Sequence, residues 1–491
     1  MRHRRSLGVL ASLLLALSSS LVSFDASAQI AVPVDDLAKG SVVATNETFS
    51  PLSLDELVRS VETSYPLLRA AEQDRVLADA ESLSADGGFD PAVRGRATTI
   101  PYGGYQNDRL DFSIDQPTPL WGTRVFSGWR YGHGDFAAYD GKYQTAEYGE
   151  VRVGAQVPMW RDGPIDRRRA SREKADIGRS AARYSVEEQR LVMIRAASIR
   201  YWDWVAAGRK LVIATSLLEM ATKRDAQLAE RVERGDLPAY ERNENLRVMH
   251  QREAQVVQAE RSLENASIEL SLYHRSKEGV ATLPDRGRLP NAIPEIDDSS
   301  TETRARLENV ALADRPEPKR IAAQIAQQRV ELSYAENQKR PGIDLFVMGS
   351  KDLGDGPKKI VPAELEVALI LDIPILNRVN EGRRRTAEAQ LAKLGEQQRY
   401  TKDRVVADVR DAESTIALAK ERAAATRREV TVARTLVTSE RERFDLGDST
   451  LLLVNLREQA YAEAELREVD ALLEHQRGIA LLRAAVGGKR R

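Results

Sequence analysis

The sequence predicts an α+β fold that is mostly α, in which long antiparallel coiled-coil helices accompany a smaller set of strands. Three observations predict it. Apolar residues repeat at heptad spacing in the C-terminal half, apolar and polar residues alternate just before each long helical pattern, and a similar seven-residue block occurs twice, at residues 230–236 and 442–448. Each copy of the block ends a long helical pattern, so the chain has an internal two-fold sequence repeat.

The first element is an export signal. Arginines at positions 2, 4 and 5 precede an apolar run from Leu7 to Val22, and the small residues Ala26–Ala28 follow. This order is typical of a cleaved secretory signal. We expect residues 1–28 to be a signal peptide and residues 29–50 to be a disordered N-terminal arm.

Composition excludes several classes of function. The chain has no cysteine, which excludes disulfides and thiolate metal sites. Its 73 lysines and arginines nearly balance 74 aspartates and glutamates, which argues against nucleic acid as a partner. After the signal, no segment approaches the ~18 apolar residues of a membrane-spanning helix, so any membrane span is expected to consist of strands.

The first structural repeat is expected at residues 51–282. It comprises helices at 53–87, β-barrel strands at 89–160 and a long helical hairpin at 164–276 with its tip near residue 235. Its clearest strand signal is the alternation of Val151, Val153, Ala155 and Val157 with other residues. A linker at 283–300, rich in Pro, Asp and Ser, follows.

The second repeat is expected at residues 301–485, with helices at 301–340, strands at 341–376 and a hairpin at 381–484 with its tip near residue 447. From Val405 to Val437 small apolar residues recur in alternating steps of four and three, which is a heptad seam. No proline interrupts residues 383–444, and a helix of that length measures about 93 Å at ~1.5 Å per residue.

The number of strands has a consequence for assembly. Pro66 and Pro158 are 34 residues further apart than the equivalent Pro316 and Pro374, and this excess forms either an enlarged extracellular loop or an extra hairpin. The chain then has four or six strands, while single-chain membrane barrels start at about eight. Because lipid does not tolerate open strand edges, several copies must share one barrel if these strands enter a bilayer.

Four segments carry a family resemblance: Ser53–Leu57, Tyr65–Ala71, Arg315–Glu317 and Arg443-Phe444-x-x-Gly447-x-Ser449. In this order they resemble the outer membrane efflux protein family typified by TolC, over nearly all of the chain after the signal. The resemblance implies a homotrimer with a 12-stranded β-barrel in the lipid of the outer membrane and an α-helical tunnel, or α-barrel, through the periplasm. It also implies that a periplasmic membrane-fusion adaptor docks at the helical tips and connects them to an inner-membrane pump of the RND or ABC type.

The duplicated tips are the first candidate site. Glycine at a helix end often serves only as a left-handed terminus, and that interpretation suffices for the two glycines taken alone. The whole block is an equally good candidate for adaptor docking, through Arg231, Gly235, Asp236, Arg443, Gly447 and Asp448.

A periplasmic gate is the second candidate site. Family members often carry aspartates a turn or two beyond this glycine, but residues 451–456 contain no acid. An acidic constriction, an apolar gate and a plain solvated helix face therefore all stay open as interpretations. The candidate gate residues are Asp236, Glu241, Asp448, Leu453 and Asn455.

The strands supply the third set of candidates. Val367, Leu369 and Leu371 alternate with other residues and are expected to face lipid, and Trp121, Trp129 and Trp160 are expected to form an aromatic girdle at the membrane interface. The alternative is the core of a soluble β-domain.

These observations and the resemblance together predict a passive exit duct rather than an enzyme. The five histidines show no metal-ligand spacing, and no cofactor is expected. The duct would export small molecules or ions across the outer membrane as part of a tripartite efflux pump. Two alternatives stay open: the exit channel of a type I protein secretion system, and a soluble periplasmic coiled-coil scaffold or adaptor.

Overall fold

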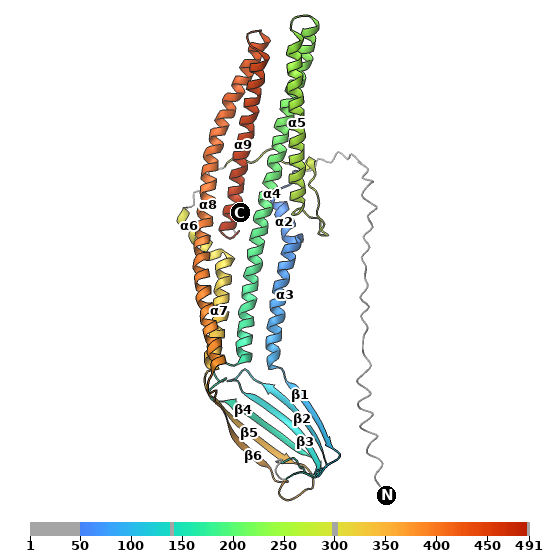
Figure 1. Cartoon of the computed structure of the whole chain (residues 1–491), viewed down its shortest axis with the longest axis vertical. Helices are drawn as coiled ribbons and strands as arrows, with labels where there is room; N and C mark the ends of the chain where they lie inside the picture. Colours follow the sequence, from blue (N-terminus) through green and yellow to red (C-terminus); the bar gives the residue numbers. More distant parts are fainter. Residues whose placement is uncertain (1–49, 138–141, 297–302, 489–491) are drawn as a thin grey trace, which may run out of the picture. The chain divides into compact units, whose positions relative to one another are not determined.

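The computed structural model describes residues 50–137, 142–296 and 303–488. The expected signal peptide, and all of the expected N-terminal arm except residue 50, lie outside these residues. Within them the chain is mostly helical and carries an antiparallel sheet, which confirms the predicted fold class at that level (Figure 1). Among the described residues, no helix is both long enough and apolar enough to cross a membrane.

One antiparallel sheet contains the six strands of the described residues, in chain order. They are β1 Ala92–Ile100, β2 Asn107–Pro117, β3 Arg124–Gly134, β4 Glu150–Pro158, β5 Gly342–Asp352 and β6 Glu364–Asp372. The extra residues of the first half form the hairpin of β2 and β3 rather than a loop. β6 ends at Asp372, short of the expected residue 376, because Pro374 has no N–H to continue the ladder.

The long helices occur as two hairpins. α4 Arg167–Glu233 pairs with α5 Ala239–Ser271, and α8 Arg378–Asp445 pairs with α9 Leu451–Ala485. The shorter helices are α2 Leu54–Ser64, α3 Pro66–Asp86, α6 Arg304–Asp314 and α7 Pro316–Asn337.

Local chemistry explains where several helices begin. α3 and α7 each start with proline, whose fixed φ suits the first helical position and whose missing N–H is not needed there. α4 starts after Asp166, whose carboxylate accepts a hydrogen bond of 2.9 Å from the backbone N–H of Arg169.

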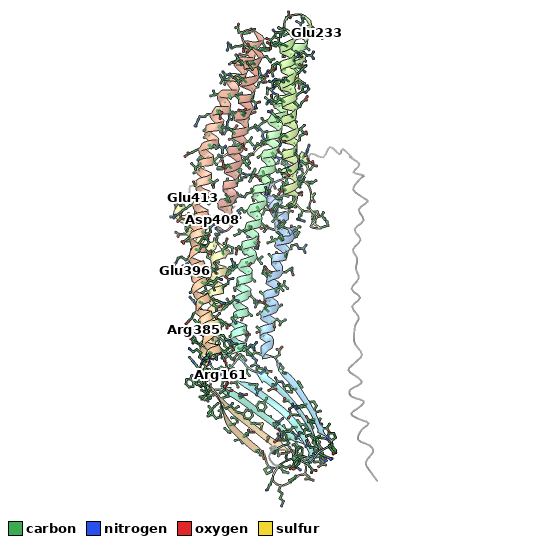
Figure 2. All side chains as sticks on the ribbon, viewed as in Figure 1. Arg161, Glu233, Arg385, Glu396, Asp408 and Glu413 are labelled. Carbon is green, nitrogen blue, oxygen red and sulfur yellow. The ribbon has the colours of Figure 1, made fainter. Side chains whose placement is uncertain are left out.

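The two hairpins pack together through α4 and α9, while α3 packs on α4 and α7 packs between α4 and α8. Within residues 50–488 the hairpin tips lie at one end of the helices, and the sheet joins α3, α4, α7 and α8 at the other end (Figure 1). Figure 2 marks these two ends by Glu233, close to a tip, and Arg161, where strands pass into helices.

The main core lies around the middle of the helices, where α2, α4, α5 and α9 meet. Five of its members are fully buried: Leu57, Val61, Trp204, Val205 and Leu270. A second seam lies between α8 and its neighbours and buries the heptad residues Val405, Val409, Ala412, Ala419, Ala423 and Val437. These small side chains allow the backbones of adjacent helices to approach closely.

Candidate functional site

One face of the sheet is apolar and exposed. The register places residues of like character opposite each other, such as Phe112 with Trp129 and Val347 with Val367. Large apolar side chains on this face are at least one-third exposed in every strand but β5: Val93, Leu110, Phe112, Ile114, Val125, Val151, Val153, Leu365, Val367, Leu369 and Leu371. An apolar area of this extent marks a surface made to be covered by something other than water.

The three expected lipid-facing residues of β6 belong to this face. Val367, Leu369 and Leu371 are 61%, 62% and 59% exposed, which is high for side chains of this kind.

The three tryptophans of the expected girdle do not form one row. Trp121 lies in the turn between β2 and β3, and Trp160 follows β4, so both are at the helical end of the sheet. Trp129 lies in the middle of β3, where its ring stacks between Phe112 and Tyr131 at centroid distances of 6.3 and 6.2 Å.

The opposite face of the sheet is polar and cross-linked by ion pairs between strands. Arg152 contacts Asp111 at 2.5 Å, and Asp115 accepts from Arg94 at 2.5 Å and lies 3.5 Å from Arg124. Opposite charges on neighbouring strands hold the register of a sheet. The sheet is therefore two-faced, with an apolar side and a side that carries the ion pairs, although Phe126, Phe346, Met348 and Ile370 also lie on the second side.

Each hairpin tip ends its first helix with the same backbone motif. Gly235 and Gly447 have φ of +81° and +82°, a region that glycine adopts without strain. The N–H of Asp236 donates to the carbonyl of Arg231 at 2.9 Å, and that of Asp448 donates to Arg443 at 2.8 Å. These are Schellman motifs, which satisfy carbonyls at a helix end.

The tips are also open at their surface. A Cβ placed on Gly235 or Gly447 would meet no heavy atom within 4 Å, and Asp236, Arg443 and Asp448 are exposed. The two tips contact each other where the guanidinium of Arg231 lies 5.9 Å from the ring centroid of Phe444.

The gate candidates fall on the first turns after the tips. Glu241 is half-buried in the first turn of α5, and Leu453 is 38% exposed near the start of α9. Asn455 is half-buried, and its side-chain oxygen is buried without a hydrogen-bond partner among the described residues. The structure thus places these residues near the tips but does not gather them into one cluster.

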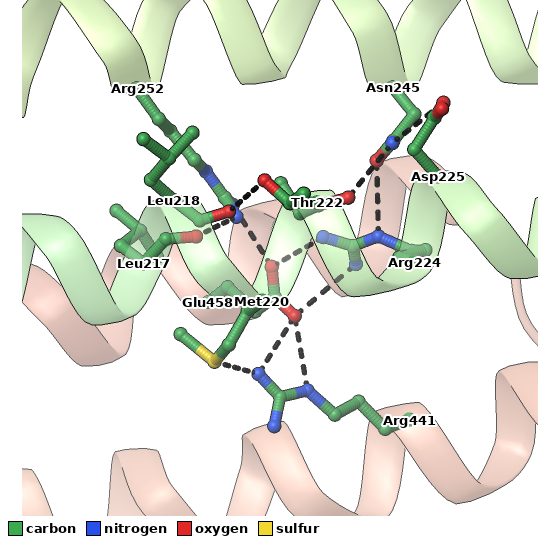
Figure 3. Close-up of polar contacts among 11 residues, drawn as sticks. Leu217, Leu218, Met220, Thr222, Arg224, Asp225, Asn245, Arg252, Arg441 and Glu458 are labelled. Carbon is green, nitrogen blue, oxygen red and sulfur yellow. Dashed lines mark hydrogen bonds and ion pairs between the residues drawn. The ribbon is translucent and has the colours of Figure 1, made fainter.

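A buried charge cluster, which the sequence analysis missed, joins all four helices of the two hairpins. Glu458 of α9 is 1% exposed and accepts from three arginines. Arg224 of α4 approaches it at 2.7 Å, Arg252 of α5 at 3.0 Å and Arg441 of α8 at 2.8 Å (Figure 3). We call Glu458 with these three arginines the Glu458 cluster.

Further polar groups complete the cluster. Arg224 also donates to the side-chain oxygen of Asn245 at 3.2 Å, and Arg252 donates to the carbonyl of Leu217 at 2.8 Å. Arg224 lies eleven residues before Gly235 and Glu458 eleven residues after Gly447, so both are about 16 Å along their helices from the tips at ~1.5 Å per residue.

The electrostatics of the cluster favour an ionised carboxylate. Burial by itself would raise the pKa of Glu458, but the attraction of Arg224, followed by that of Arg252 and Arg441, holds it below the usual range. The pKa of Arg252 is lowered, first by burial and then by repulsion from Arg224 and Arg441, against the opposing pull of Glu458. Arginine nevertheless stays charged at any physiological pH.

The sequence held only a weak signal for this cluster. Glu458 follows Val454 by four residues and precedes Ala462 by four, so it occupies a position of the buried α9 stripe. A charged residue on an apolar stripe indicates a paired buried ion. Its three partners come from three other helices, and no local pattern identifies them.

In the described residues, no group of three or more His, Cys, Asp or Glu side chains could hold a metal ion. One hollow, of about 570 Å³, lies between α4, α5 and α9 and is partly open. Its walls combine alanines and leucines with a polar rim, and the hydroxyl of Ser262, which lines it, donates to the carbonyl of Gln258 at 2.9 Å.

At the level of sequence, the chain matches no protein-family model and no curated protein. Solved structures, in contrast, resemble it over most of their length.

Three of these structures are outer-membrane channels. The outer-membrane channel OprN shares 17% identity, with 89% of this chain and 90% of that chain covered and a TM-score of 0.64. The CmeC outer membrane channel of Campylobacter jejuni shares 14% identity over 91% of both chains, with a TM-score of 0.62. The MtrE outer membrane channel of Neisseria gonorrhoeae, in its open state, shares 16% identity over 88% of both chains, with a TM-score of 0.63. The chain therefore has the fold of outer-membrane channels.

Proposed function

We propose that this chain is the outer-membrane exit channel of a tripartite efflux pump, acting as a homotrimer. One observation carries the proposal: a sheet with an exposed apolar face is joined directly to two helical hairpins, in a chain with the fold of outer-membrane channels. The apolar face contacts outer-membrane lipid, and the hairpins extend into the periplasm. The channel does no chemistry and needs no cofactor.

The tips supply the contact with the rest of the pump. Arg231, Asp236, Arg443 and Asp448 are charged groups beside glycine turns with open space around them. A periplasmic membrane-fusion adaptor docks there and connects the channel to the inner-membrane pump. The gate lies in the same region, and Asp236, Glu241, Asp448, Leu453 and Asn455 are its candidate residues.

Gene deletion and fractionation test this function. Loss of the chain is expected to raise sensitivity to the compounds of the partner pump, and the chain is expected in the outer-membrane fraction. A chain found in the soluble periplasmic extract would support a scaffold instead. Unchanged sensitivity together with a lost secreted polypeptide would support type I protein secretion.

A further inference from the structure

We infer that three copies of this chain close an 18-stranded barrel, wider than the 12-stranded barrel that the family resemblance implies. The inference rests on the proposed trimer and goes beyond it in the strand count and in the surfaces that join the copies. It follows from the six-stranded sheet, since three copies of that sheet supply 18 strands. Three observations support it.

First, β2 and β3 are as two-faced as the other strands. On β2, Leu110, Phe112 and Ile114 are 38%, 51% and 51% exposed on the apolar face. On the polar face, Asp111 reaches across β3 to Arg152 of β4. If the β2–β3 hairpin lay in water outside the membrane, an apolar face aligned with the apolar faces of β4 and β6 would not be expected.

Second, the width of the sheet matches that of the helices it joins. Six strands ~4.8 Å apart and tilted by about 40° span roughly 38 Å around a barrel wall. Four helices, α3, α4, α7 and α8, span about 32 to 40 Å at spacings of ~8 to 10 Å. Four strands would span only about 25 Å, so six strands match the width of the four helices more closely than four do.

Third, the two edges of the sheet are complementary. β1 contains Arg94 and Arg96 and no acid, while β6 contains Glu364, Glu366 and Asp372 and no base. Register places all five residues on the polar face. Arg94, Glu364 and Asp372 already pair within the chain, with Asp115, Lys142 and Arg161. Among the described residues neither edge has a further strand beside it, and Arg96 and Glu366 have no ion-pair partner.

The surface that fits each edge is therefore the other edge of a second copy. β1 and β6 run in opposite directions along the sheet, so β6 of one copy and β1 of the next form another antiparallel pair. Their apolar residues, Val93 and Leu365 to Leu371, would extend the lipid-facing belt. The contact is head-to-tail and closes into a ring.

A barrel of 18 strands has a bore of a different class. Barrel diameter grows roughly linearly with strand number, so 18 strands give about 1.5 times the diameter of 12, and barrels of 16–18 strands leave an aqueous channel. An 18-stranded barrel would therefore let larger substrates leave through the outer membrane than a 12-stranded barrel does.

A matched pair of substitutions on β2 tests whether the extra hairpin lies in the membrane. Ile114→Arg places a charge on the apolar face, and Ser113→Arg places the same charge on the polar face. We expect Ile114→Arg and Leu369→Arg each to lower the yield of outer-membrane trimer at least about tenfold, and Ser113→Arg to leave it unchanged. Normal insertion of Ile114→Arg beside a failing Leu369→Arg would overturn the 18-strand barrel and leave the exit channel intact.

Cysteine cross-linking tests the edges and counts the copies, because the natural chain has no cysteine. Thr98→Cys on β1 combined with Glu366→Cys or Ala368→Cys on β6 should give covalent dimers and trimers on oxidation, and nothing larger. Ser127→Cys on β3 with Ala368→Cys is the control and should give no intermolecular product. A ladder that stops at dimers, or no cross-link from β1 to β6 in intact outer membranes, would overturn the inference.

Charge reversal tests the complementarity itself. Arg96→Glu and Glu366→Arg should each lower the fraction of trimer, and the double variant should restore it. A double variant no better than either single one would show that these side chains do not meet. Absence of every variant and of the natural chain from membranes would instead overturn the proposed function.

Discussion

At the scale of single residues, the Glu458 cluster is the most sensitive point of the hairpins. Glu458→Gln removes the counter-charge of three guanidinium groups, two of them on side chains that are almost fully buried. Breaking a buried ion pair by removing one partner costs about 3–5 kcal/mol. We expect hydrogen exchange of α4 and α9 around the cluster to accelerate accordingly.

The control for this prediction is Glu429→Gln. Glu429 pairs with Arg467 at 2.6 Å, but both side chains are nearly half exposed. Exposed pairs contribute about 0–1 kcal/mol. Equal effects of the two substitutions would contradict the importance assigned to the Glu458 cluster.

We expect His475 to make the stability of the hairpins depend on pH. It is 5% exposed, and burial followed by the charge of Lys420 lowers its pKa below the ordinary value of about 6.5. The folded state then binds fewer protons than the unfolded state between these two pKa values, so stability falls as the pH drops below about 6.5.

The measurement is thermal unfolding at pH 7.5, 6.5 and 5.5. His475→Gln should remove the part of the pH dependence that His475 causes. If the natural chain and the His475→Gln variant lost thermal stability equally between pH 7.5 and 5.5, His475 would not be the cause of the pH dependence.

Residue-scale features differ in how far the sequence predicts them. The tip glycines were identifiable, because a duplicated block ending in Gly-Asp marks a helix terminus in any context. The arginine partners of Glu458 were not, because Arg224, Arg252 and Arg441 look like the many surface arginines of this chain. The burial of Arg224 and Arg252, and their meeting with Glu458, follow from the packing of two hairpins that are far apart in sequence.

At the scale of elements, the left-handed turn at Gly447 limits which residues can replace this glycine. A β-branched residue there costs about 1–2 kcal/mol of backbone strain, although its Cβ would meet no neighbour. Gly447→Val should therefore speed hydrogen exchange of residues 444–450 about tenfold, at about 1.4 kcal/mol per factor of ten. If the adaptor docks there, cross-linking to it should fall in parallel.

Gly447→Asn is the matched control, since asparagine tolerates the left-handed conformation. It should keep both exchange and cross-linking close to the natural values. Weak adaptor coupling in both variants, with normal exchange in the asparagine variant, would mean that the glycine itself is contacted.

The apolar residues of β6 allow a test of whether this face of the sheet contacts lipid. Leu369→Arg puts a charge on the face proposed to contact lipid, at a cost of about 2–4 kcal/mol near the bilayer midplane. The amount of heat-modifiable assembly in the outer membrane should fall. The control is Ala368→Arg, on the polar face; equal insertion of both variants would show that the face is not buried in lipid.

Elements with long periodic patterns were the most predictable. The heptad seam from Val405 to Val437 lies on the buried side of α8, and the alternating segments at 151–157 and 365–371 lie in β4 and β6. The hairpin of β2 and β3 could not be separated from a loop, because the glycines at positions 128, 132 and 134 interrupt the alternation of β3. Pairing with β4 fixes it as a strand.

At the scale of the whole molecule, assembly was the least predictable property. The sequence indicates that one chain has too few strands for a barrel. The diameter of the barrel depends on the number of strands, and that number depends on whether β2 and β3 form a hairpin. We expect the chain, extracted from outer membranes in mild detergent, to have three times the mass of one processed copy by light scattering. A monomer under these conditions would contradict the trimer.

The position of the Glu458 cluster has a mechanical consequence. The two hairpins pack on each other through α4 and α9, and the Glu458 cluster joins all four of their helices. Separating the hairpins at the cluster would leave buried arginines without their shared carboxylate. About 16 Å of each hairpin extends from the Glu458 cluster to the tip. In that part the contact of Arg231 with Phe444 holds the hairpins together far more weakly than the cluster does. Bending of the helices therefore costs little free energy between the Glu458 cluster and the tips, and much more at the cluster itself. Large movements are confined to the last few turns before the tips.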